Sequence, residues 1–230
     1  MSTAIITGAS RGLGLALARS LAQRGWRLVI NARGAHNLQR VAAELDRVTE
    51  VRALAGDIAD GWHREALIEA AGQPIELLVN NASMLGPSPQ PALADYPLEV
   101  LQRVYAVNVL APLALIQLAL PRMPAGACVV NVTSDAATEP YEGWGGYGSS
   151  KAALEQLSAI LAAERPALRV YAVDPGDMRT RMHQEAFPTQ DISDRPPPEN
   201  SVPGLLELIG SPLPSGRYQA RQLLAGEVPS

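Results

Sequence analysis

Apolar residues recur along the chain with two alternating spacings. Short runs that are almost entirely apolar alternate with longer stretches in which apolar residues follow helical spacing. A short run of this kind is typical of a strand buried on both faces, as in a parallel sheet, and the longer stretches predict connecting helices. We therefore expect strands at residues 3–7, 27–31, 51–55, 77–80, 128–133, 169–173 and 216–220, and helices at residues 13–24, 35–47, 62–71, 98–120, 147–163 and 205–209.

This order of elements predicts an α/β fold, in which a doubly wound parallel sheet of about seven strands carries helices on both faces. The chain has 230 residues, and 47% of them are hydrophobic. That length and composition suit one domain with a sizeable core, so we expect residues 1–230 to form a single domain.

Composition also bears on partners and location. The net charge is −4 and the basic residues are scattered singly, so we expect no nucleic-acid partner. The longest apolar stretch, residues 109–120, is interrupted by a proline and a glutamine and is shorter than a bilayer span, so we expect no membrane partner. A single cysteine, Cys128, and a start that runs at once into an apolar strand point to a cytoplasmic protein. His36 and His63 lack neighbouring metal ligands, so we expect no metal site.

The first predicted strand runs into a glycine-rich loop with the spacing Gly8-x3-Gly12-x-Gly14. Glycine lets the backbone turn sharply and approach a pyrophosphate, whose charge is met by the amides and dipole of a helix N-terminus. The loop therefore predicts a dinucleotide site, although three glycines after a strand can also form only a tight turn. The cofactor-binding residues expected here are Gly8, Ser10, Arg11, Gly12, Leu13 and Gly14.

Lys151 is the only lysine in a chain that contains eighteen arginines. Tyr147 precedes it by four residues in a predicted helix, so the phenol and the ammonium share one helical face. A neighbouring cation favours phenolate, and we expect it to lower the tyrosine pKa from about 10 toward the range of a general acid or base. The alternative is that one lysine merely survived a bias toward arginine.

Ser134 ends the apolar run that begins at Cys128, so its hydroxyl is expected at the carboxyl edge of the sheet, where open α/β sheets bind ligands. Together with Tyr147, Lys151 and the glycine loop, Ser134 resembles the active site of the short-chain dehydrogenase/reductase family. The resemblance implies a Rossmann-type sheet and hydride transfer at a nicotinamide. It implies that Ser134 hydrogen-bonds the substrate carbonyl, that Tyr147 delivers the proton, and that Lys151 also binds the cofactor ribose.

Pro112 lies inside the helix predicted at residues 98–120. Proline lacks an N–H for the carbonyl four residues earlier, which here belongs to Asn108. The sequence thus predicts a free Asn108 carbonyl, and the family resemblance implies a catalytic role in which Asn108 holds a water linking Lys151 to solvent. An ordinary proline kink beside a buried asparagine is the alternative.

The residues after the second predicted strand indicate which dinucleotide binds. A carboxylate there accepts hydrogen bonds from the ribose 2′-hydroxyl of NAD(H), whereas an arginine accommodates the 2′-phosphate of NADP(H). This chain has Arg33 at that place and no acidic residue until Glu44, and Arg11 is a second cation in the glycine loop. We therefore expect NADP(H) in preference to NAD(H), unless both arginines are only solvated surface residues.

The resemblance implies further cofactor contacts at the ends of later strands. They are Asp57, Ile58, Asn80, Ala82, Pro175, Gly176 and Thr180. The chain departs from the family pattern at Ser83, where glycine is usual, and at Asp174, where asparagine is common. We expect the Ser83 side chain to tighten the backbone near the ribose.

Substrate contacts are expected from loops around the predicted catalytic residues. Residues 177–203 resemble the mobile lid of the family, and methionines near its start suggest an apolar, adaptable pocket. Aromatic residues before Tyr147 either form a pocket wall or pack the loop onto its own domain. The expected substrate contacts are Met84, Tyr141, Trp144 and Met178.

These features together predict an NADP(H)-dependent oxidoreductase that reduces a small apolar ketone or aldehyde, or oxidises the alcohol, with Tyr147 as proton donor. Epimerisation on the same site is an alternative within enzymes. A sensor or scaffold protein that binds NADP(H) without turnover is the alternative from another class. The resemblance also implies a homodimer or homotetramer joined by the helices that carry Asn108 and Tyr147.

Overall fold

The computed structural model describes residues 1–225 and contains a seven-stranded parallel sheet. The strand order is β3-β2-β1-β4-β5-β6-β7, and each neighbouring pair runs parallel. The predicted strands and the doubly wound α/β fold are therefore confirmed. The strands are β1 (Thr3–Ile6), β2 (Arg27–Ala32), β3 (Val51–Ala55), β4 (Leu77–Asn80), β5 (Cys128–Val132), β6 (Arg169–Asp174) and β7 (Gly216–Gln219).

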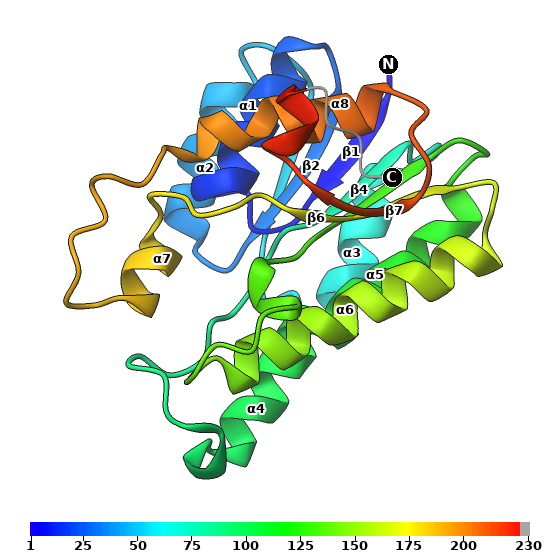
Figure 1. Cartoon of the computed structure of the whole chain (residues 1–230). Helices are drawn as coiled ribbons and strands as arrows, with labels where there is room; N and C mark the ends of the chain where they lie inside the picture. The colour runs from blue at the N-terminus through cyan, green and yellow to red at the C-terminus, as the bar shows by residue number, and fades with distance from the viewer. Residues whose placement is uncertain (226–230) are drawn as a thin grey trace.

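Helices cover both faces of the sheet (Figure 1). One face carries α1 (Gly12–Gln23), α2 (Ala35–Leu45) and α8 (Val202–Gly210), and the other carries α3 (Gly61–Ala71), α5 (Ala111–Ala119) and α6 (Gly145–Glu164). Successive strand residues enter opposite cores, because side chains alternate across a sheet. Ile6 and Ile30 pack into the core on the α1 side, whereas Ile5 and Val29 pack into the core on the α3 side.

The strand order reverses at the centre of the sheet. From β1 the chain first builds outward through β2 and β3, and then returns to add β4 to β7 on the other side of β1. At such a switch point the loops that follow the two central strands diverge and leave a crevice at the carboxyl edge. The fold therefore places the loops after β1 and β4 on either side of one crevice.

The helix predicted at residues 98–120 changes its winding in the middle. α4 (Leu98–Tyr105) passes into a π-helical turn at Ala106–Leu110 and then into α5. Pro112 stands in the first turn of α5 and has no N–H to donate, which accounts for a local change in the hydrogen-bond ladder at this point. The turn carries Asn108, whose side chain is fully buried.

The helical run Leu98–Arg122 is long and apolar enough, by length and composition alone, to cross a membrane. Our expectation considered only the shorter stretch at residues 109–120. Half of the apolar window is buried within the protein, where Val107 and Leu115 belong to the core on the α3 side. The buried apolar residues of this run therefore pack against the sheet, whereas Leu98 and Leu110 are exposed.

Residues 177–203, expected as an irregular lid, contain helical segments. α7 (Arg181–Ala186) begins after Thr180, whose hydroxyl accepts a hydrogen bond from the His183 N–H at 3.2 Å. α8 begins at Val202, inside the expected loop, with Pro203 in its first turn where a missing N–H breaks no bond. Local capping thus gives this region more regular structure than its composition predicts.

The helix predicted at residues 62–71 begins one residue earlier. Asp60 caps it, because its carboxylate accepts the Trp62 N–H at 3.0 Å. The Nε2 atom of His63 lies 2.7 Å from Asn31 Nδ2, and the His63 ring fills the space beside Gly56. His63 is therefore a packing residue between α3 and the sheet.

Candidate active site

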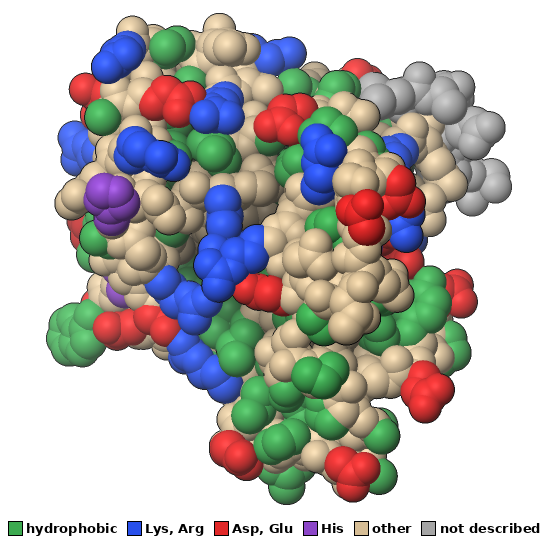
Figure 2. Space-filling model, turned by 90° about the vertical axis from the view of Figure 1, so that its left-hand side faces the viewer, with side chains coloured by type: hydrophobic (Ala, Val, Ile, Leu, Met, Phe, Trp, Pro, Cys, Tyr) green, Lys and Arg blue, Asp and Glu red, His purple; other side chains and the backbone are tan. Residues whose placement is uncertain are grey.

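A cleft of about 850 Å³ opens at the carboxyl edge of the sheet, where the strand order reverses. Its size falls in the range of cofactor and ligand pockets. Figure 2 looks onto this side of the molecule and shows basic side chains gathered beside a hollow. The arginines that line the cleft are Arg11, Arg33, Arg179 and Arg181.

The glycine loop forms one wall of the cleft and is packed against the loop after β4. Gly8 has φ = 69°, and a Cβ built on it would lie 2.9 Å from Ala82 Cα, so only glycine fits there without displacement. Asn81 Nδ2 donates to the carbonyls of Thr7 at 2.8 Å and Gly8 at 3.2 Å. The Thr7 hydroxyl in turn accepts the N–H groups of Asn81 and Ala82 at 3.0 and 2.9 Å. The loop is thereby held in a fixed cradle.

The start of α1 fits the phosphates of a dinucleotide. Arg11 is the N-cap residue, its side chain makes no capping bond among the described residues, and α1 carries no acidic residue in its first turn. Free helix amides of this kind bind anions. Arg33 follows β2 and lines the same cleft, and neither Arg11 nor Arg33 pairs with a carboxylate within residues 1–225. The charge and the free amides suit a phosphorylated cofactor.

Tyr147 and Lys151 lie together at the floor of the cleft, one turn apart on α6. They are 7% and 2% exposed, and Lys151 Nζ lies 5.4 Å from the centroid of the Tyr147 ring. Lys151 also donates to the Val132 carbonyl at 2.8 Å, at the end of β5. The amine and the phenol therefore share one buried site, as their spacing predicts.

Burial disfavours the charged form of both side chains and shifts the pKa of each accordingly. It raises the pKa of Tyr147, and it lowers the pKa of Lys151 to about 8. We expected a lowered pKa for Tyr147. The opposite holds because the cost of removing a phenolate from water outweighs the effect of an ammonium whose own charge is disfavoured by the same burial. The neutral phenol, which is the proton-donating form, is therefore maintained.

Ser134 follows β5 and faces the cleft beside Tyr147. Its hydroxyl donates to Asp135 Oδ1 at 2.8 Å and accepts the Ala136 N–H at 3.2 Å. These bonds fix the hydroxyl at the start of a short 3₁₀ turn, Asp135–Ala137. Ser134 and Tyr147 thus present two hydroxyl groups to the same part of the cleft.

Asn108 lies behind the cleft and holds α6 to the loop after β4. Its Nδ2 donates to the Met84 carbonyl and to Ser150 Oγ, each at 2.9 Å, and its Oδ1 accepts the Met84 N–H at 2.8 Å. The Ser83 hydroxyl donates to the same Oδ1 at 3.2 Å. The Asn108 side chain therefore joins three segments around Tyr147.

Apolar side chains form the wall opposite the glycine loop. Leu85 and Tyr147 belong to one small cluster, and Trp144 packs edge-on against Tyr147 with ring centroids 5.8 Å apart. Met182 and Ala186 of α7 pack on this cluster and line the cleft. A carbonyl group presented to Tyr147 would therefore carry an apolar substituent along this wall.

Most of the predicted site residues meet in this cleft. The lining contains Gly8, Ser10, Arg11, Gly12, Leu13, Arg33, Asp57, Ile58, Ala82, Met84, Ser134, Trp144, Tyr147, Lys151, Pro175, Gly176, Met178 and Thr180. Thr180 lies close to the glycine loop, because a Cβ on Gly12 would meet its methyl group at 3.7 Å. Loops that follow six strands, β1 to β6, therefore converge as the motifs predict.

Four predicted residues lie elsewhere. Gly14 packs beneath the loop, where a Cβ would lie 2.6 Å from the Gly8 carbonyl oxygen, and Asn108 lies behind Tyr147. Asn80 is buried inside the sheet and donates to Asn131 Oδ1 at 2.8 Å. Tyr141 is 47% exposed and donates to Asp135 Oδ2 at 3.0 Å, behind Trp144. None of the four occurs in the described cleft lining.

Sequence reasoning missed Asn81 and Ala186 as lining residues. Asn81 directly follows the strand end, so the alternation of side chains along β4 was an available signal for choosing it over Asn80. Ala186 comes from the short helix α7, whose position depends on tertiary packing. No periodicity in the sequence places it beside Tyr147.

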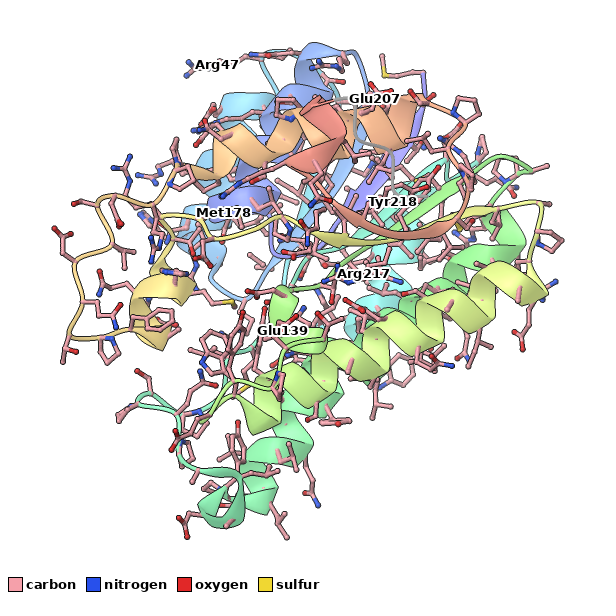
Figure 3. All side chains as sticks on the ribbon, viewed as in Figure 1. Arg47, Glu139, Met178, Glu207, Arg217 and Tyr218 are labelled. Atoms are coloured by element: carbon pink, nitrogen blue, oxygen red, sulfur yellow. The ribbon has the colours of Figure 1, made fainter. Side chains whose placement is uncertain are left out.

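A charged network lies on the far side of Ser134 from the cleft. Arg217 of β7 donates from Nε to Glu155 at 3.0 Å and from a terminal nitrogen to the Ser134 carbonyl at 3.4 Å. A terminal nitrogen also lies 3.6 Å from Asp174 Oδ2. Figure 3 shows Arg217 reaching from β7 toward α6. Burial raises the pKa of Asp174, and the network therefore places counter-charge beside a carboxylate that lines the cleft.

Known proteins share these features. Residues 2–191 match the family described as short chain dehydrogenase. A benzil reductase of Saccharomyces cerevisiae that forms (S)-benzoin is 32% identical over 98% of this chain and 86% of its own length. A sepiapterin reductase of Meriones unguiculatus is 36% identical over 80% of this chain and 77% of its own.

Solved structures agree with the fold. A short chain dehydrogenase of Shigella flexneri, complexed with NADP, has a TM-score of 0.88 at 27% identity and covers 96% of this chain and 97% of its own. One of Escherichia coli, complexed with NADPH, has a TM-score of 0.86 at 27% identity, with 96% of each chain covered. Family match, relatives and cleft geometry lead to one conclusion: the chain belongs to the short-chain dehydrogenase/reductase family, whose members act on alcohol and carbonyl groups.

Proposed function

We propose that this enzyme uses NADPH to reduce an apolar ketone or aldehyde. The observation that carries the proposal is the burial of Tyr147 beside Lys151 at the floor of a cleft, between a glycine cradle and an apolar wall. The cradle suits the dinucleotide, and the wall suits an uncharged substrate. A protonated phenol faces the space between them.

The residues divide the chemistry as follows. A nicotinamide dinucleotide held by the glycine loop would supply the hydride. Tyr147 gives its phenolic proton to the substrate oxygen. The Ser134 hydroxyl turns from Asp135 Oδ1 and donates a hydrogen bond to the same oxygen, where negative charge develops. Lys151 holds positive charge beside the phenolate that results. Trp144 and Leu85 help to exclude water from this step because they pack against Tyr147 and line the same cleft.

Preference for NADP(H) over NAD(H) rests on the charges around the expected ribose position. Arg33 and Arg11 line that part of the cleft. Asp57 lines the same cleft, but it pairs with Arg103 and accepts the Ala59 N–H at 2.9 Å, so it is already engaged. Two structural relatives were solved with NADP or NADPH, which supports the same preference.

The substrate is an apolar carbonyl compound, and aromatic ones suit the wall formed by Trp144, Leu85 and Met182. Benzil is the substrate named for one relative. Aromatic diketones are therefore the first compounds to try, with aliphatic ketones and aldehydes as the comparison.

The test follows the loss of NADPH absorbance with a panel of diketones, ketones, aldehydes and quinones. We expect turnover by the wild-type enzyme, no measurable turnover by Tyr147→Phe, and wild-type turnover by Tyr105→Phe, a matched loss of one hydroxyl outside the cleft. Full activity of Tyr147→Phe would refute the proton-donor assignment. NADPH binding without oxidation of any compound would favour the sensor or scaffold alternative.

We also propose that the enzyme is a homodimer or homotetramer. Leu98, Leu110 and Ile160 are 70%, 59% and 44% exposed on the helical run and on α6, which gives these helices apolar positions to pair. Light scattering after size-exclusion chromatography would show whether the chain is a monomer. The cytoplasmic location remains a prediction from composition.

A further inference from the structure

Asp135 places a carboxylate at the reacting end of the cleft. It directly follows Ser134, it is exposed, and it lines the same cleft as Tyr147. A carboxylate differs in chemistry from the apolar wall beside it, and the proposed mechanism uses it only as the resting partner of the Ser134 hydroxyl. The structure therefore holds a strong hydrogen-bond acceptor next to the position of the substrate carbonyl.

The charge of Asp135 is not matched by a neighbouring cation. Three other aspartates that line the cleft, Asp57, Asp174 and Asp177, each pair with an arginine. Within residues 1–225, Asp135 forms no such pair with a basic side chain. Its carboxylate is therefore available to accept hydrogen bonds from neutral donors.

Three donors fix the orientation of the Asp135 carboxylate. Oδ1 accepts the Ser134 hydroxyl and the Ala136 N–H, each at 2.8 Å, and Oδ2 accepts the Tyr141 hydroxyl at 3.0 Å. An ionised carboxylate offers about four acceptor positions. The group is thus held in place before a substrate arrives, and Tyr141 contributes to this although it lies outside the cleft lining.

Reduction of a carbonyl group disturbs one of these three bonds. Ser134 must point its proton at the substrate oxygen, and its Oγ then faces Asp135 Oδ1 at 2.8 Å with no proton between them. Two acceptors at this distance repel each other, and a carboxylate that loses a donor where the substrate keeps water away is destabilised. A substrate that brings its own donor to Asp135 removes this cost.

A hydroxyl group on the carbon next to the carbonyl has a suitable position. When the two oxygens of such a compound lie on the same side, they are about one hydrogen-bond length apart, as Ser134 Oγ and Asp135 Oδ1 are. The carbonyl oxygen can then accept from Ser134 while the hydroxyl donates to Asp135. A cationic donor would be opposed by the Lys151 ammonium beside Tyr147, which favours a neutral one.

We propose that Asp135 is a specificity-determining residue that selects carbonyl compounds with a hydroxyl group on the adjacent carbon. This inference rests on the proposed function and narrows its substrate class to α-hydroxy ketones and aldehydes. The Asp135 carboxylate accepts the substrate hydroxyl as Ser134 transfers its own hydrogen bond to the carbonyl oxygen. The apolar wall receives the remaining substituent.

The experiment compares the reduction of α-hydroxyacetophenone and α-methoxyacetophenone, which differ only in whether the oxygen carries a proton or a methyl group. We expect the wild type to prefer the hydroxy ketone about 10- to 100-fold in kcat/KM. Asp135→Asn should reduce this preference about 10-fold, because an uncharged amide is a weaker acceptor. Glu139→Gln, the same loss of charge in the same loop but outside the cleft lining, should leave it unchanged (Figure 3).

The methoxy ketone distinguishes recognition from a structural effect. In Asp135→Asn its kcat/KM should not fall, since Ser134 no longer has to leave a carboxylate and its Oγ still accepts the Ala136 N–H. A preference that Asp135→Asn leaves unchanged would overturn the proposal, even if both ketones react more slowly, because Asp135 would then only hold Ser134 in place.

A second readout does not need turnover. With NADP⁺ in place of NADPH there is no hydride to transfer, so calorimetric titration of each ketone measures binding alone. We expect the wild type to bind the hydroxy ketone about 10-fold more tightly, and Asp135→Asn to lose most of this difference. If the wild type reduces neither compound but shows the difference, the proposed function fails and the role of Asp135 stands. Equal Kd values for the two ketones in the wild type would contradict that role, whether or not reduction occurs.

Discussion

Lys151 donates a hydrogen bond of 2.8 Å to the carbonyl of Val132, two residues before Ser134. The bond ties α6, which carries Tyr147, to the strand end that carries Ser134. The amine therefore has a geometric function as well as an electrostatic one, since it fixes the two hydroxyl-bearing segments relative to each other. A guanidinium is broader than an ammonium, and the site that surrounds Lys151 is almost fully buried.

Replacing Lys151 by methionine should separate activity from stability. Methionine has a similar length and no charge, so we expect kcat to fall at least about 100-fold while the variant is more stable than the wild type at pH 7. The folded-state pKa of Lys151 is about 8, below the ordinary value of 10.5, so the unfolded chain binds more protons than the folded protein between these pH values. The free energy of unfolding of the wild type therefore increases, relative to that of the variant, as pH rises from 8 to 10.5. Urea denaturation at pH 7 and pH 10 measures both effects. A difference in the free energy of unfolding between the two proteins that is the same at both pH values would contradict the lowered pKa of Lys151.

Alcohol oxidation should depend more steeply on pH than carbonyl reduction does. Burial raises the pKa of Tyr147, so the phenol needed for reduction is fully populated at pH 7, whereas the phenolate needed as a base in oxidation is scarce. We expect the log of the oxidation rate to rise with pH with a slope of about 1 between pH 6 and 9. Initial rates of both directions across that range check this, and a flat oxidation profile would count against Tyr147 as the base.

Arg33→Ala should weaken binding of NADPH and spare NADH. Loss of a charge-assisted hydrogen bond to the 2′-phosphate corresponds to about a 10- to 100-fold rise in Kd. Arg47→Ala is the matched control, because Arg47 lies at the top of the view in Figure 3, outside the cleft lining. Calorimetric titration with both cofactors gives the comparison, and an equal loss for NADH would show that Arg33 does not read the phosphate.

Gly8→Ala should cost more than Gly25→Ala, although both positions have left-handed backbone. Their φ values are 69° and 76°, so each substitution carries a similar conformational cost of about 1–2 kcal/mol. A Cβ at Gly25 meets nothing within 4 Å, whereas one at Gly8 meets Asn81 Nδ2 at 2.8 Å. We therefore expect only Gly8→Ala to lose cofactor affinity as well as stability. Thermal denaturation with and without NADPH measures both quantities, and equal shifts for the two variants would argue against the cradle.

Arg217→Met should destabilise the protein by about 1–3 kcal/mol at pH 7, because it leaves Asp174 and Glu155 without their counter-charge in a partly solvated network. Burial already raises the pKa of Asp174, and loss of Arg217 raises it further. As pH falls through this raised pKa, Asp174 of the variant takes up a proton. The difference in the free energy of unfolding between the wild type and the variant should then become smaller. Denaturation at pH 7 and pH 5 tests this, and a deficit that grows at pH 5 would exclude the explanation.

The sequence predicts most of the strands well because they are short, mainly apolar runs set between polar turns. The exception is β7, whose residues Gly216–Gln219 are mostly polar. The motif spacing likewise brings Gly8, Ser134, Tyr147 and Lys151 to one edge of the sheet, since parallel strands place their following loops together. The same rule shows that Asn81 lines the cleft and Asn80 is buried in the sheet only when the exact end of β4 is known. A shift of one residue turns a cleft side chain into a buried one.

Other features depend on packing that no local pattern encodes. The direction of the Tyr147 pKa shift follows from how completely the phenol is removed from water, which the i,i+4 spacing to Lys151 does not reveal. Tyr141 and Trp144 stand three residues apart in one loop, yet only Trp144 reaches the cleft. The link from Arg217 to Ser134 joins residues 83 positions apart in the sequence.

The contact between Arg217 and Ser134 also bears on the order in which the site is completed during synthesis of the chain. The glycine loop follows β1, whereas the guanidinium that contacts the Ser134 carbonyl belongs to β7, the last strand among residues 1–225. A polypeptide interrupted before β7 would contain the glycine loop and Tyr147 but not Arg217. Synthesis must therefore pass β7 before Ser134 is supported from behind, and we expect products shortened before this strand to be poor oxidoreductases even where they fold.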